Sequence, residues 1–112
     1  MDRCEGLGSV GRRPNLARRL TALRAEVGGL REALGVLEEQ LVHAVDVSAD
    51  AATRALVQEG PLAQRERQRA ESDERRVRRQ RDETAARLAQ LSAESDDLLE
   101  RLFAGSNPEV TG

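Results

Sequence analysis

Aromatic rings, thiols and long apolar runs are all scarce in this chain of 112 residues. Phe103 is the only aromatic residue, so large rings do not fill a globular core. Cys4 is the only cysteine, which excludes an internal disulfide and a multi-thiol metal site but allows a bridge between two chains. No run reaches the roughly 18 apolar residues of a membrane span, and residues 1–15 lack the apolar stretch of a secretory signal. We therefore expect a cytoplasmic protein.

The residues that are abundant suit a coiled coil. Charged residues make up 34% of the chain and apolar residues 38%, so only a narrow stripe of leucine, valine and alanine can be buried. One pair of helices buries too little apolar surface to offset the loss of chain entropy comfortably. The composition therefore predicts an all-α protein that associates with itself or with a protein partner.

A heptad repeat of apolar residues begins at Leu16 and alternates steps of four and three without a break to Leu41. Beyond Leu41 we expect the apolar positions to continue as Val45, Ala49, Ala52 and Leu56. This path requires two consecutive steps of four, a stutter that locally unwinds a supercoil. The predicted interaction seam consists of Leu16, Leu20, Leu23, Val27, Leu30, Leu34, Leu37, Leu41, Val45 and Leu56 in the first half, and of Val77, Leu88, Leu91, Leu98 and Leu102 in the second.

A glycine–proline pair divides the chain into halves of similar length. Gly60 suits the end of a helix, and Pro61 suits the first turn of the next. Two consecutive helices of equal length favour an antiparallel coiled-coil hairpin, in which residues equally far from the turn, such as Leu23 and Leu98, face each other. The predicted organisation is a flexible tail at 1–15, helices at 16–59 and 61–104 around the Gly60–Pro61 turn, and a flexible tail at 105–112.

The order of charges also favours antiparallel pairing. Residues 12–31 carry six arginines and one glutamate, whereas residues 32–59 carry six acidic residues and one arginine. The second half repeats this order, with eight arginines and four acids at 64–81, then one arginine and six acids at 82–100. Antiparallel helices therefore set opposite charges side by side. The same complementarity would arise between two chains, so pairing within one chain and between chains both stay open, as does a dimeric four-helix bundle.

Two local patterns resemble parts of known kinds of chemical site. The motif GLGSVG at residues 6–11 matches the dinucleotide-binding glycine pattern, but the strand–helix–strand unit that this function needs is missing. His43 has Glu39 and Asp46 one turn away on either side, without a second histidine or a thiol. We interpret the motif as part of the tail and His43 as a solvated side chain. We expect no enzyme activity, cofactor or metal.

Arginines are concentrated at residues 64–81, where they form either a solvated face of ion pairs or a site for an anion. Interspersed acids and the lack of aromatic residues favour the ion-paired face, and a net charge of −2 argues against nucleic-acid binding. The residues that would contact an anion, a nucleotide or a partner are Ser72, Arg75, Arg76, Arg78, Arg79 and Arg81.

A helical hairpin with this arginine-rich face resembles the actinobacterial two-helix anti-sigma proteins that bind cyclic di-GMP. That family reads its ligand with Glu, Ser, Arg, Gln and Asp at steps of four, three, four and four, which fall here on Gln68, Ser72, Arg75, Arg79 and Glu83. Gln68 and Arg79 depart from the family pattern, and Glu83 is a near substitute. The resemblance implies a bacterial transcription regulator that binds a sigma factor. The residues by themselves favour a non-catalytic adaptor that acts through helix–helix binding.

Overall fold

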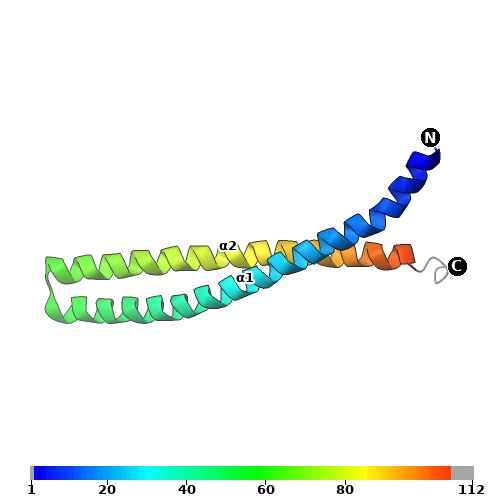
Figure 1. Cartoon of the computed structure of the whole chain (residues 1–112). Coiled ribbons are helices and arrows are strands. Elements are labelled where there is room, and N and C mark those ends of the chain that lie inside the picture. Colours follow the sequence, from blue (N-terminus) through cyan, green and yellow to red (C-terminus); the bar gives the residue numbers. More distant parts are fainter. Residues whose placement is uncertain (1, 107–112) are drawn as a thin grey trace. The chain divides into compact units, whose positions relative to one another are not determined.

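The computed structural model describes the backbone of residues 2–106 and the side chains of residues 14–104 (Figure 1). This part of the chain consists of two helices, α1 at Asp2–Gln58 and α2 at Pro61–Ser106. They pack together as a hairpin, which confirms the all-α prediction and places the helix pairing within one chain. Neither helix, over its described residues, has an apolar stretch sufficient to cross a membrane.

The helix bounds differ from the expected ones mainly at the open end of the hairpin, where both helices are longer. α1 begins at Asp2 rather than Leu16 and therefore continues through the segment expected to be a tail, with Pro14 inside it. An existing helix gains one hydrogen bond for each residue added, which favours extension. The proline removes one such bond, at a cost of about 3 kcal/mol. α2 extends to Ser106, and the rest of the expected C-terminal tail lies outside the described residues.

The chain reverses through Glu59 and Gly60. The N–H of Glu59 donates to the carbonyl of Ala55 at 3.3 Å, and Glu59 has a φ of 42°, in the left-handed region. The carbonyl of Gly60 accepts from the N–H of Gln64 at 3.1 Å, so Gly60 caps the start of α2. Gly60 precedes Pro61, and a residue before proline disfavours the helical region. The left-handed residue that ends α1 is Glu59 and not Gly60. Gly60 was expected to end α1, and the structure moves that role back by one residue.

The hairpin divides into two compact units. In one unit, α1 up to Gly29 pairs with α2 from Leu88 onward. Its buried residues are large and apolar, as the heptad repeat predicts: Leu20, Val27, Leu91 and Leu98. Other predicted seam positions in this unit, including Leu23 and Leu102, are half-buried.

The second unit, Leu30–Arg87, contains the turn and has a core of smaller residues. Its buried residues are Leu41, Ser48, Ala51 and Ala55 from α1, and Ala63, Ala70 and Val77 from α2. Together with the half-buried Ala44, the α1 residues continue the strict alternation of three and four. The expected stutter is therefore wrong. Val45 and Leu56, expected on the seam, are exposed instead.

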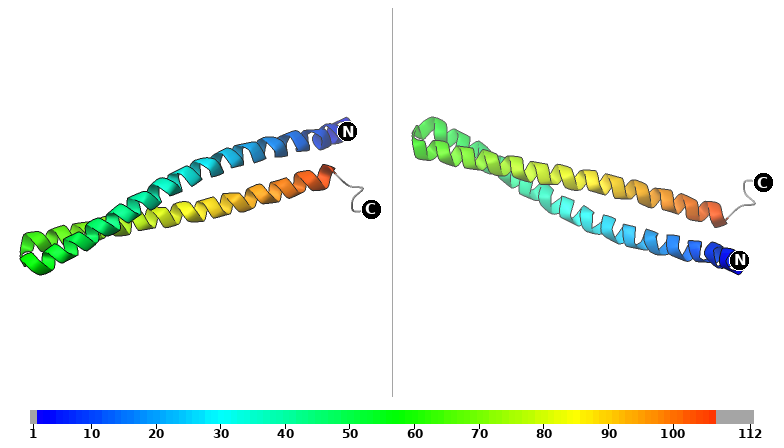
Figure 2. Two further views of the ribbon diagram at one scale, coloured as in Figure 1. Left: turned by 90° about the horizontal axis from the view of Figure 1, so that it is seen from below. Right: turned by 90° about the horizontal axis from the view of Figure 1, so that it is seen from above.

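The register of the helices follows from the short turn. Counting outward from Glu59 places Ala55 level with Ala63, and Leu41 level with Val77, and all four of these residues are buried. In the first unit the same count places Leu98 level with Leu20 rather than with Leu23. This shift by one seam position arises because the chain reverses at Glu59 and not at the Gly60–Pro61 pair. Figure 2 shows α1 and α2 side by side next to the turn in both of its views.

Three charged residues occupy seam positions of α2 in the second unit: Arg67, Glu74 and Arg81 are half-buried. The register places Arg67 level with Ala51, and Glu74 level with Ala44. Long charged side chains on one helix therefore meet alanines on the other. This difference in size explains why α1 turns its small residues inward, since a valine or leucine there would compete with the arginine and glutamate stems for space.

Candidate protein-interaction surface

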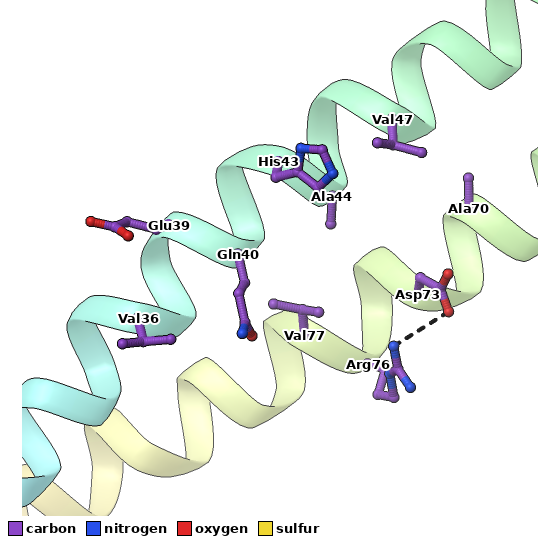
Figure 3. Close-up of a pocket in the computed structure, with 10 residues that line it drawn as sticks. All are labelled: Val36, Glu39, Gln40, His43, Ala44, Val47, Ala70, Asp73, Arg76 and Val77. Carbon is purple, nitrogen blue, oxygen red and sulfur yellow. Dashed lines mark ion pairs between the residues drawn. The ribbon is translucent and has the colours of Figure 1, made fainter.

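A groove of about 600 Å³ runs along one side of the Leu30–Arg87 unit (Figure 3). Figure 3 shows Val47 across from Ala70, and Gln40 across from Val77. Val36 lies at one end of the groove and is 53% exposed. We call this hollow the groove. Its α1 wall presents Val36 and Val47 to solvent, whereas Ala70 and Val77 on its α2 wall are buried.

Charged side chains edge the groove. Arg76 Nη2 and Asp73 Oδ1 form an ion pair at 3.5 Å on the α2 side (Figure 3). His43 and Glu39 line the α1 side. Asp46 lies instead against a separate hollow of about 380 Å³, so the three residues considered for a metal or base site do not converge. No group of metal-ligating side chains is present among the described residues.

The hollow that Asp46 lines follows another side of α1 and contains Val42 and Val45. Val42 is 65% exposed and Val45 39% exposed. Further along α1, Ala49 is exposed, Ala52 is half-buried and Leu56 is 77% exposed. These residues recur at steps of three and four and therefore share one face of the helix. We call this face the outer stripe: Val42, Val45, Ala49, Ala52 and Leu56.

Beyond Leu41, α1 therefore has its large apolar side chains on exposed faces and its small ones against α2. Ser48, Ala51 and Ala55 are buried against α2, whereas Val45 and Leu56 face water. Full burial of a valine or leucine side chain contributes about 1.5–3 kcal/mol relative to exposure. The hairpin alone leaves that contribution unused at the outer stripe. The heptad pattern led us to expect Val45, Ala49, Ala52 and Leu56 on the hairpin seam, although a step of three from Leu41 to Ala44 would have kept the repeat unbroken.

Most arginines of the run 64–81 are exposed, and several form ion pairs within α2. Arg78 Nη1 lies 2.8 Å from Glu74 Oε2. Arg81 Nε donates to Asp82 Oδ1 at 2.7 Å. These contacts join residues of the same helix, so they do not display the opposite-charge pairing between helices that the sequence suggested.

One seam arginine has an incomplete set of partners. Arg67 Nε is buried without a hydrogen-bond acceptor and lies 3.9 Å from Glu71 Oε1. A buried donor that lacks an acceptor costs about 1–3 kcal/mol. Arg67 therefore weakens the seam at the point where α1 contributes only alanine.

The residues considered for anion binding do not gather at one place. Ser72, Arg75 and Arg79 are exposed, and their spacing places them on one outward face of α2 together with Gln68 and Glu83. Arg76 lines the groove, whereas Arg78 and Arg81 line the hollow on the other side. Within the described part of the chain, Arg75 and Arg79 form no ion pair.

The chain matches no protein-family model, no curated protein and no solved structure.

Proposed function

We propose that this chain is a non-catalytic interaction module that binds another α-helix along the second half of α1. The observation that carries the proposal is the arrangement of apolar side chains in the Leu30–Arg87 unit. Val36, Val42, Val45 and Leu56 are exposed, while alanine and serine occupy much of the seam between the helices. A third helix along the outer stripe would bury Val42, Val45 and Leu56 and would add a core that the hairpin itself lacks.

The geometry suits recognition of a helix. Amphipathic helices bind hydrophobic grooves through anchors at steps of three and four, and the outer stripe has this spacing. The groove adds a concave surface between α1 and α2 that is lined by Val47, Ala70 and Val77. Its charged edge at Asp73 and Arg76 would orient the bound helix, since rim charges contribute to specificity more than to affinity.

The proposal is tested by capture with a tagged chain at micromolar concentration, combined with sedimentation of the purified protein. We expect the chain to be recovered with a helical protein or to sediment as an oligomer. Replacement of Val36, Val42, Val45 and Val47 by serine should abolish both results without loss of helicity, because these side chains are exposed. A stable monomer that captures no protein would contradict the proposal.

A second function, an anti-sigma hairpin that responds to cyclic di-GMP, is supported by one observation. Arg75 and Arg79 lie one turn apart on the outward face of α2, and neither is paired with a carboxylate among the described residues. Two such guanidinium groups suit a phosphate. Calorimetry with cyclic di-GMP should give heat that disappears in the Arg75→Ala, Arg79→Ala double variant and persists in Arg65→Ala. An absence of heat with the original chain would remove the ligand from this second function.

A further inference from the structure

We propose that the part of the hairpin next to the turn opens locally and reversibly while the two helices stay paired beyond it. This part consists of residues 42–58 of α1 and 61–76 of α2, and we call it the turn segment. It ends at the layer in which Leu41 and Val77 are both buried. The inference goes beyond the proposed function, because it concerns the chain by itself and requires no partner.

The turn segment buries only small side chains. Its buried residues are Ser48, Ala51, Ala55, Ala63 and Ala70. In the rest of the described hairpin the buried residues are all leucine or valine: Leu20, Val27, Leu41, Val77, Leu91 and Leu98. The free energy gained by packing rises with the apolar area removed from water, and an alanine removes far less of it than a leucine. Separation of the helices is therefore least costly in the turn segment.

Charged side chains share the seam of the turn segment with these alanines. Arg67 and Glu74 are half-buried at seam positions of α2. Glu74 Oε2 lies 2.8 Å from Arg78 Nη1 of the same helix, so this ion pair persists when the helices separate. Arg67 Nε is buried without an acceptor, and separation would expose it to water. Opening therefore preserves one ion pair and satisfies one donor.

The short turn opposes this opening. Only Glu59 and Gly60 separate the helices, and a short connection reduces the entropy that is lost when two segments pair. Connectivity alone would therefore make the turn end the most stable part of a hairpin, and the open end the part that frays. Side-chain composition outweighs connectivity here. The two factors predict opposite gradients of stability along the helices, so an experiment can separate them.

Amide hydrogen exchange of the purified chain, resolved by residue, measures this gradient. A helix that loses its packing partner loses most of its stability, so its amides exchange during each opening. We expect the amides of residues 44–57 and 65–75 to be at least about tenfold less protected than those of residues 34–41 and 77–91. Equal protection along both helices, or the greatest protection next to the turn, would overturn the inference.

The urea dependence of exchange separates local opening from unfolding of the whole hairpin. The slope of the opening free energy against urea concentration scales with the surface that opening exposes. Local opening predicts a shallow slope for residues 44–57 and a steep slope for residues 77–91 at low urea concentration. A single slope shared by all amides would show that the chain unfolds as one unit, which would also overturn the inference.

Leucine at the charged seam positions should keep the turn segment closed. Arg67→Leu with Glu74→Leu places apolar side chains opposite alanines of α1, so the protection of residues 44–57 should rise at least about tenfold. As a matched control, Arg65→Leu with Glu66→Leu removes the same two charges from exposed positions and should raise that protection by less than about threefold. No gain at the seam, or an equal gain from the exposed pair, would overturn the inference.

The outcome does not depend on the proposed function. Exchange is compared at several protein concentrations, because association would raise protection with concentration, whereas opening within one hairpin is independent of concentration. Uniform protection in a chain that captures another helix would overturn the opening and leave the helix-binding function intact. A gradient of protection in a monomer that captures no protein would overturn the helix-binding function and support the opening.

Discussion

Glu59 carries the one unusual backbone conformation in the described part of the chain, with a φ of 42°. A left-handed conformation costs an L-residue about 1–2 kcal/mol, and glycine adopts it without that cost but loses more entropy on folding. We predict that Glu59→Gly raises the free energy of unfolding by about 0.5–1 kcal/mol in urea denaturation. A decrease would show that the Glu59 side chain contributes more than its backbone costs.

Gly60 provides the matched control for that substitution. Its φ is not positive, and a Cβ built on it meets no atom within 4 Å. Gly60→Ala should therefore fold normally, with a change within about 0.5 kcal/mol of zero or slightly stabilising. Glycine is therefore predicted to stabilise the fold at position 59 and to be replaceable at position 60. The sequence alone had led us to expect the helix-ending glycine at position 60.

Arg67 is the residue at which the seam is weakest. Its Nε is buried without an acceptor, and the register places the side chain level with Ala51. Arg67→Leu removes the unsatisfied donor and adds an apolar seam residue, so we predict a gain of about 1 kcal/mol in the free energy of unfolding. Arg65→Leu, at an exposed position, should change it by less than about 0.5 kcal/mol. A loss at Arg67 would indicate that the arginine fixes the register.

The sequence predicted individual seam residues well where leucine occupies the repeat and poorly where alanine does. Leu20, Val27, Leu91 and Leu98 follow directly from heptad spacing and are buried. Between residues 42 and 56, apolar residues occupy two adjacent faces of α1, and hydrophobicity alone favours the face with valine and leucine. The choice depends instead on the size of the facing α2 residues, which is a property of the pair and not of either helix.

At the level of elements, the Gly60–Pro61 pair was sufficient to predict a two-helix hairpin, because glycine is favoured just after a helix and proline in the first turn of the next one. The start of α1 at Asp2 was not predictable from glycine content. The α2 ion pairs were predictable in kind, since acids and arginines recur three and four residues apart. Their exact partners depend on side-chain rotamers.

Glycines at exposed positions of α1 weaken that helix. Gly28, Gly29 and Gly35 are exposed, and a Cβ added at any of them meets no atom within 4 Å. Each costs about 0.5–1 kcal/mol relative to alanine. We predict that the triple alanine variant gains about 2 kcal/mol, measured as a higher midpoint of thermal unfolding by circular dichroism. An unchanged or lower midpoint would indicate that the glycines serve a bend in α1 or a contact with a partner.

At the level of the whole molecule, the chain has few core-forming residues and leaves some of them on its surface. A chain with one aromatic residue and 38% apolar residues has little material for a core, and part of that material lies outside the helix seam. Association along the outer stripe would bury apolar surface that the hairpin leaves exposed. Association would also stabilise the fold by mass action, so the midpoint of unfolding should rise with protein concentration.

Capture with a tagged chain, combined with sedimentation equilibrium across a wide range of concentrations, tests the helix-binding proposal most directly. The proposal predicts either a helical protein in the capture or a mass that rises reversibly above that of the monomer, and the loss of both in the Val45→Asp, Leu56→Asp variant. A monomer at every concentration that captures no helical protein, or binding that this variant leaves unchanged, would contradict it.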